Sequence, residues 1–194
     1  KNLFVINSPL QLLNSIEAIY KFELKNIIIV AIYNRSIKNI EQIEAQLGKI
    51  NCDEIVRFNP LKEGKLKGYV KLIRYLKKYS YEYIFLGELE DFRFRAIVAN
   101  LNKTNLFLVD EGSATVALYE STIKKDRINR FKFKSLKFIF NGLKINIKDN
   151  INFFTYYDFN PLKKGLVIKN NLEYLKKDFI KNELDYEDTL FFLG

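Results

Sequence analysis

The sequence has 194 residues, of which 48% are hydrophobic and 28% are charged, and its 32 basic and 23 acidic residues give a net charge of +9. These fractions are typical of a chain with a packed core and exclude an intrinsically disordered one. The length accommodates one full α/β domain, so we expect residues 1–194 to form a single domain.

Several kinds of active site are excluded by residue types that the sequence lacks. It contains no His, which rules out a Ser-His-Asp triad, a histidine metal site and an imidazole acid or base. Its single cysteine, Cys52, cannot form an internal disulfide or a zinc cluster. The sequence also has no Gly-rich phosphate-binding motif of the dinucleotide or P-loop type.

The hydrophobic segments are short. The longest clean apolar run, residues 27–33, falls far below the ~20 residues of a membrane-spanning helix. The apolar stretch at residues 3–6 is too short for a signal peptide. One cysteine and no export signal predict a cytoplasmic protein.

Apolar runs and helical patterns alternate along the first two thirds of the chain. The chain order predicts a strand at 3–7, a helix at 8–20, a strand at 26–32, a helix at 36–48, a strand at 54–58, a helix at 61–79, a strand at 82–86, a helix at 91–101 and a strand at 105–109. This alternation predicts a Rossmann-like α/β fold, with a parallel sheet and helices on both of its faces.

The first strand leads into a helix start. Ser8 can cap the helix, Pro9 suits its first position, and Gln11 completes a capping box. Capping alone explains these residues. The alternative is that the free backbone N–H groups receive an anionic or hydroxyl-rich ligand.

Two basic segments allow more than one interpretation. The 61–79 helix carries Lys67, Lys71, Arg74 and Lys78 along one face, which fits either a solvated face or attraction to an anionic membrane. Residues 123–140 interleave lysines and arginines with phenylalanines, which fits a core segment, an amphipathic membrane segment or a platform for single-stranded nucleic acid. The helical spacing of the aromatic residues favours core or membrane, and disfavours nucleic acid.

The remaining third predicts a strand at 151–156, a helix at 172–184 and a strand at 188–194. The last strand is of the buried type and coincides with the end of the sequence. We therefore expect the native chain to continue beyond Gly194.

The sharpest chemical signal is Asp110-Glu111-Gly112, directly after an apolar strand. Ligands of parallel sheets bind at the carboxyl ends of the strands, where residues 7–9 and 87–88 are also expected. A partly shielded carboxylate there can have a raised pKa and act as a general base. The ordinary alternative is a strand-to-helix turn with acidic residues at the helix N-terminus. Glu88, Glu90 and Asp91 add acidic groups that Arg93 and Arg95 can pair with.

Two stretches resemble a known family. Residues 2–15, with an apolar strand, a small residue, Pro and Gln-x-Leu, resemble the opening of bacterial sialyltransferases of glycosyltransferase family 52 and their polysialyltransferase-like relatives. Residues 107–115 resemble the acidic-acidic-Gly motif of bacterial sialyltransferases. Residues 93–102 are also similar to the family, and residues 188–194 are similar to its crossover strand into a second domain.

The resemblance implies the N-terminal, acceptor-side half of a GT-B enzyme that transfers sialic acid from CMP-sialic acid to a glycan or glycolipid acceptor of capsule or lipooligosaccharide type. The implied reaction is inverting and needs no metal or cofactor. The general base falls on Asp110, with Glu111 as second choice. The implied substrate-binding residues are Asn7, Ser8, Pro9, Gln11, Gly112 and Ser113.

The family's His-Pro motif, which contacts the donor phosphate, belongs to the second domain, and this sequence has no His. We therefore expect the nucleotide-sugar donor to bind through a C-terminal domain that these residues lack, and the isolated domain to be inactive. The alternatives are a non-catalytic basic α/β module that binds membrane or nucleic acid, and a different nucleotide-sugar glycosyltransferase on the same fold. The basic faces are consistent with peripheral contact with the inner face of an anionic membrane.

Overall fold

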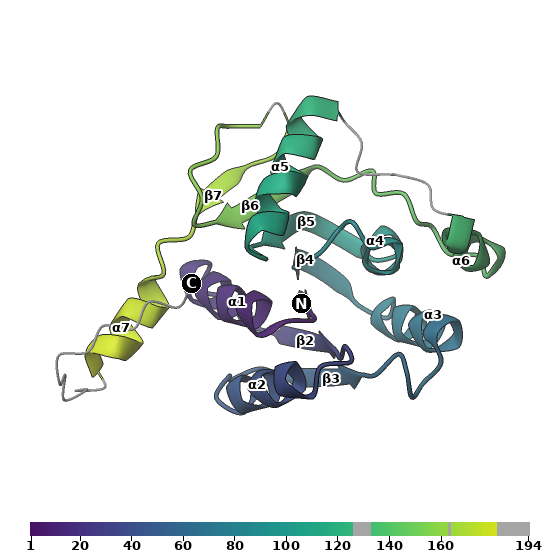
Figure 1. The fold of residues 1–194 in the computed structure, drawn as a ribbon, viewed down its shortest axis with the longest axis horizontal. Coiled ribbons are helices and arrows are strands. Elements are labelled where there is room, and N and C mark those ends of the chain that lie inside the picture. The colour runs from purple at the N-terminus through teal and green to yellow at the C-terminus, as the bar shows by residue number, and fades with distance from the viewer. Residues whose placement is uncertain (126–132, 163, 182–194) are drawn as a thin grey trace.

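The fold is built on a parallel sheet, as the alternating pattern predicts. The structure is a computed structural model that describes residues 1–125, 133–162 and 164–181. Among these residues, seven strands form one all-parallel sheet in the order β3-β2-β1-β4-β5-β6-β7 (Figure 1). The Rossmann-like α/β arrangement is therefore confirmed.

The strands are β1 (Asn2–Ile6), β2 (Ile27–Ile32), β3 (Glu54–Phe58), β4 (Ser80–Leu86), β5 (Asn102–Val109), β6 (Ile151–Thr155) and β7 (Val167–Lys169). The helices are α1 (Pro9–Lys21), α2 (Ile37–Leu47), α3 (Lys65–Leu76), α4 (Phe92–Ala99), α5 (Ser113–Lys125), α6 (Leu136–Phe140) and α7 (Glu173–Lys181), and a 3-10 turn (Phe133–Ser135) precedes α6. No described helix is both long enough and apolar enough to cross a bilayer.

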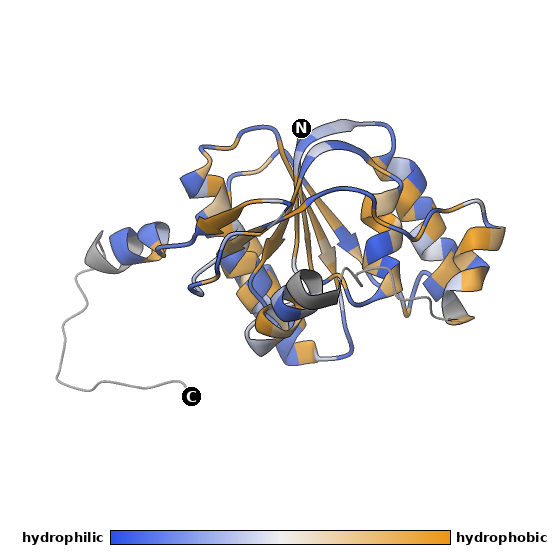
Figure 2. Ribbon diagram, turned by 90° about the horizontal axis from the view of Figure 1, so that it is seen from above, coloured by the Kyte–Doolittle hydropathy of each residue, from blue (hydrophilic) through white to orange (hydrophobic). Residues whose placement is uncertain are grey.

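Helices cover both faces of the sheet. Figure 1 shows α1 and α2 on one side of the strands and α3 and α4 on the other. Alternate residues of β1 supply the two cores: Phe4 and Ile6 pack with α1 and α2, whereas Leu3 and Val5 pack with α3 and α4. Because both faces are covered, every residue of β1 and β2 is buried. The apolar interior runs along the strands in Figure 2.

Aromatic rings fill the core beneath α1. Phe85 stacks on Phe4, with 4.6 Å between ring centroids, and on Phe107 at 5.3 Å. Phe22, just after α1, places its ring edge-on against Phe85, Phe107 and Phe154. These contacts attach the end of α1 to the middle strands. They therefore fix the position of the helix whose first turn lies at the candidate site.

Two elements differ from the prediction. Helix α3 begins at Lys65 rather than residue 61, because the Asn59 side chain accepts hydrogen bonds from the backbone N–H groups of Leu61 and Lys62 and holds them in a turn. Strand β7 has three residues, too few for a periodic pattern, and was not predicted. The strand expected at 188–194 lies outside the described residues, as does part of the 123–140 segment.

Replacing Phe85 by Ala should lower the free energy of unfolding by about 3–5 kcal/mol, because the fully buried ring leaves a cavity between β4 and α1. Urea denaturation measures the loss. Replacing the exposed Phe140 by Ala is the matched control and should change stability by less than about 0.5 kcal/mol. Equal losses for the two variants would contradict the packing described here.

Candidate active site

Three turns meet at the carboxyl edge of the sheet. Strand order reverses between β1 and β4, since β2 and β3 lie on one side of β1 while β4 and β5 lie on the other. The crevice at such a reversal is the usual ligand site of open parallel sheets. The sheet order thus brings together the turns at Asn7, Gly87–Glu88 and Asp110–Gly112, which are far apart in the sequence.

Gln11 joins the first two turns. Its backbone N–H donates to the Ser8 hydroxyl at 3.3 Å, and its side-chain oxygen accepts from the backbone N–H of Asn7 at 2.8 Å. The predicted cap is therefore present, although Gln11 reaches Asn7 rather than Ser8. The Gln11 side chain is fully buried and lies against Gly87, where a Cβ would stand 1.9 Å from its Cδ. Only glycine leaves room for this contact.

Asp110, the first choice for the general base, is fully buried. Its Oδ2 accepts from the backbone N–H of Tyr156 at 2.8 Å, and its main-chain oxygen accepts from the side-chain amide of Asn14 at 3.1 Å. Burial raises the pKa of Asp110 to about 6, against the opposing hydrogen bonds from Tyr156 and Thr155. The residue thus ties the end of β5 to β6 and α1.

Glu111, the next residue, is half-buried and lines a pocket. Its backbone N–H donates to the Thr115 hydroxyl at 2.7 Å, which holds the turn into α5. Burial and then the charge of Glu88 raise the pKa of Glu111, the nearby Gln11 amide lowers it, and the net result is a pKa of about 7. The carboxyl group is therefore poised to exchange a proton near neutral pH.

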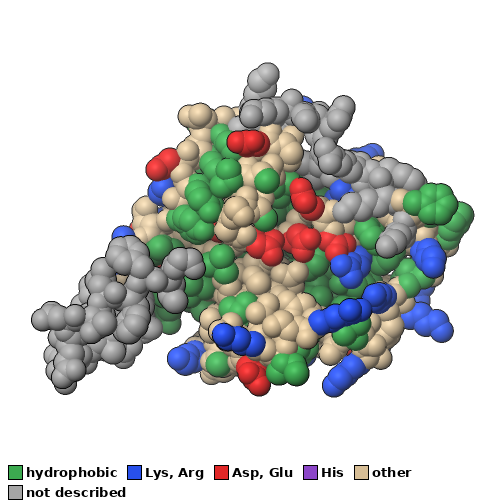
Figure 3. All heavy atoms as spheres, viewed as in Figure 1, with side chains coloured by type: hydrophobic (Ala, Val, Ile, Leu, Met, Phe, Trp, Pro, Cys, Tyr) green, Lys and Arg blue, Asp and Glu red, His purple; other side chains and the backbone are tan. Residues whose placement is uncertain are grey.

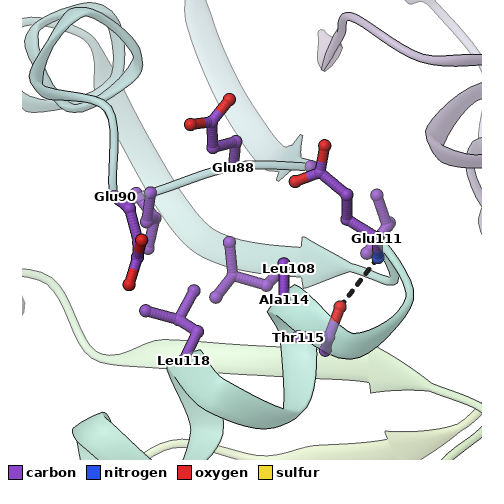
Figure 4. A pocket seen from close by; sticks show the side chains of 10 residues that line it. Glu88, Glu90, Leu108, Glu111, Ala114, Thr115 and Leu118 are labelled. Carbon is purple, nitrogen blue, oxygen red and sulfur yellow. Dashed lines mark hydrogen bonds between the residues drawn. The ribbon is translucent and has the colours of Figure 1, made fainter.

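Glu88 forms the other acidic wall of the pocket. Its Oε2 accepts from the Asn7 side-chain amide at 3.2 Å. Its pKa is raised, first by burial and then by the charge of Asp91. Figure 4 shows Glu88 and Glu111 reaching over the same side of the pocket.

The floor of the pocket is apolar, formed by Leu108, Ala114 and Leu118, and Glu90 lies at its far end (Figure 4). Acidic side chains gather in a band near the middle of the face in Figure 3, with basic side chains close by. A small apolar pocket with carboxylates at its rim favours a ligand that offers both carbon–hydrogen faces and hydroxyl groups.

The predicted substrate-binding residues lie in the neighbouring turns and helix starts, and none of them lines the pocket itself. Gly112 adopts a φ of +65°, which permits the sharp turn before α5, and Ser113 is exposed at the first position of that helix. Pro9 occupies the first turn of α1, whose capping hydroxyl belongs to Ser8. The expected ion pair between Arg93 and Asp91 is present at the start of α4.

The supporting residues Asn14, Thr115 and Tyr156 were not singled out in the sequence. Asn14 gives no distinct local signal, because Gln11, Ser15 and Glu17 of the same helix are also polar and buried. Tyr156 acts through its backbone, so its identity carries no signal. Within the described residues, no cluster of three or more His, Cys, Asp or Glu side chains is arranged to hold a metal ion.

Comparisons with protein-family models, with curated proteins and with solved structures gave no match. The interpretation of the site therefore depends on its geometry and chemistry.

Replacing Gly87 by Ala should lower the free energy of unfolding by about 1–3 kcal/mol, because the added methyl group displaces Gln11 and its bond to Asn7. Thermal unfolding followed by circular dichroism measures the loss. Gly48→Ala is the control, since its Cβ would make only ordinary contacts at 3.7 Å. A Gly87→Ala variant as stable as wild type would show that the two turns are not tightly joined.

Proposed function

We propose that the chain is the acceptor-side half of an inverting glycosyltransferase in which Glu111 removes the proton from the attacking sugar hydroxyl. The observation that carries this proposal is the half-buried Glu111 carboxyl group, with a pKa of about 7, on a pocket at the switch point of a parallel sheet. A sugar hydroxyl needs such a base because its own pKa is far too high for ionisation at neutral pH.

The structure favours Glu111 over Asp110 for this role. Asp110 is fully buried, so a substrate hydroxyl cannot reach its carboxylate, and its Oδ2 already accepts from the backbone N–H of Tyr156. Glu111 borders the pocket directly. We therefore assign Asp110 a positioning role: it fixes the backbone from which Glu111 projects.

The resemblance of residues 2–15 and 107–115 to bacterial sialyltransferases supports CMP-sialic acid as the donor. In this proposal a second domain supplies the groups that bind the nucleotide. The proposed reaction is a single displacement at the anomeric carbon and includes no metal.

The charge of the pocket points to the class of acceptor. Glu88, Glu90 and Glu111 all line it, and an anionic sugar would be repelled by them at close range. A neutral terminal sugar, presented on a glycan or glycolipid, fits this environment better. The proposal therefore favours an acceptor of lipooligosaccharide type over a polymer that is already sialylated.

Glu111→Gln should reduce turnover of the full-length enzyme by about 10²–10⁴-fold, because the variant keeps the shape of the side chain but cannot accept the proton. Transfer from CMP-sialic acid to a neutral terminal galactoside measures the loss. Glu41→Gln, on the exposed surface of α2, is the matched control and should leave turnover unchanged.

Circular dichroism should show that both variants remain folded. Near-normal turnover of Glu111→Gln would overturn the assignment of the base. If the wild-type enzyme transferred no sugar from CMP-sialic acid but did so from another nucleotide sugar, Glu111 would remain the proposed base and CMP-sialic acid would be rejected as the donor.

A further inference from the structure

Large apolar side chains are exposed together around α6. The exposed fractions are 82% for Phe133, 42% for Ile139 and 83% for Phe140. Scattered exposed apolar residues are common on protein surfaces. A group of them within one short segment is typical of a surface that binds another protein or a membrane.

The segment is anchored so that these side chains face outward. Phe138 is buried and packs against the ring of Tyr69 on α3, with centroids 6.0 Å apart, and against Phe92 at 5.4 Å. Phe138 therefore supplies the core contact of α6. Ile139 and Phe140, the next two residues, remain exposed to solvent.

The neighbouring helix presents positive charge. Lys67, Lys71 and Arg74 are exposed along one face of α3, while Val70 and Ile73 between them pack into the core. The sequence has no Asp or Glu from residue 64 to 81 or from residue 133 to 148. At the edge of the molecule where Figure 1 places α3 and α6, Figure 3 shows exposed hydrophobic side chains beside Lys and Arg side chains.

We infer that this surface docks on an anionic lipid bilayer. We call it the α3–α6 surface, and it comprises Lys67, Lys71, Arg74, Phe133, Ile139 and Phe140. Aromatic rings partition into the headgroup boundary, while neighbouring lysines and arginines bind anionic headgroups. The two kinds of residue in one place match both layers of a membrane interface.

A membrane explains the surface better than single-stranded nucleic acid does. Proteins that bind single strands combine stacking aromatic side chains with a positively charged groove that follows the backbone. Here the cations lie along the outside of a single helix, and the aromatic side chains project from a separate short segment.

The docking surface lies close to the candidate site. Phe92, which packs against Phe138, begins α4, and this helix follows the loop that carries Glu88 and Glu90. Docking of the α3–α6 surface on a bilayer would therefore place the pocket near an acceptor that is bound to the same membrane. The inference itself does not depend on the proposed function, because it concerns binding alone.

The test is sedimentation of the protein with vesicles of phosphatidylcholine alone or mixed with phosphatidylglycerol. We expect binding to the mixed vesicles only, weakening as salt is raised. The Lys67→Glu/Lys71→Glu variant should bind at least about 25-fold more weakly, since each basic residue near the headgroups strengthens binding about fivefold. Phe140→Ser should also weaken binding.

The controls lie in and just after α2, on the opposite face of the sheet, where Ile37, Lys38 and Lys49 are exposed. Lys38→Glu/Lys49→Glu and Ile37→Ser carry the same kinds of change and should bind nearly as wild type does. Equal weakening by test and control variants would overturn the inference, as would no binding of the wild type to mixed vesicles.

Two further outcomes would identify another partner and also overturn the inference. One is binding of a single-stranded oligonucleotide without vesicle binding. The other is self-association in light scattering that Phe140→Ser abolishes, again without vesicle binding. None of these measurements uses donor or acceptor, so their failure is separate from failure of the proposed catalytic role.

Discussion

The contact between Gln11 and Gly87 determines how the candidate site is assembled. Gln11 is fully buried, accepts a hydrogen bond from Asn7, and occupies the space that any side chain at position 87 would need. It thereby holds the turns after β1 and β4 side by side at the point where strand order reverses. Asn7 then reaches Glu88, and Glu88 lies beside Glu111, so the electrostatics of the pocket depend on this one packing arrangement.

The two raised pKa values oppose folding at neutral pH. The pKa of Asp110 rises from 3.8 to about 6 and that of Glu111 from 4.5 to about 7, so the folded chain binds these protons more tightly than the unfolded chain does. Their contribution to stability is therefore lost as pH rises from about 4 to about 7. Such a cost is typical of sites in which a carboxyl group is held ready for proton transfer.

Much of the fold could be predicted from sequence because both cores depend on apolar spacing. The strand predicted at 26–32 and the helix predicted at 36–48 correspond closely to β2 and α2. The three-residue β7 could not be predicted, because its pairing with β6 depends on long-range contacts rather than on a local pattern.

The location of the candidate site could be predicted from the sequence, but the different roles of its two adjacent carboxylates could not. Asp110 and Glu111 are adjacent carboxylates with the same local pattern, and sequence alone favoured the first. The structure separates them: Asp110 turns into the protein toward Tyr156, and Glu111 borders the pocket with Glu88. That distinction arises from the pairing of β5 with β6, which joins residues that are more than forty positions apart.

The catalytic role of Glu111 depends on its pKa, which burial and the charge of Glu88 raise to about 7. Titration of the glutamate side-chain carboxyl resonances by NMR tests it directly, with Glu111→Gln used to assign the signal. The account predicts a Glu111 pKa of about 7 in the wild type and a lower value in Glu88→Gln, because the like charge is removed. An ordinary pKa near 4.5 in the wild type, or one that Glu88→Gln leaves unchanged, would contradict it.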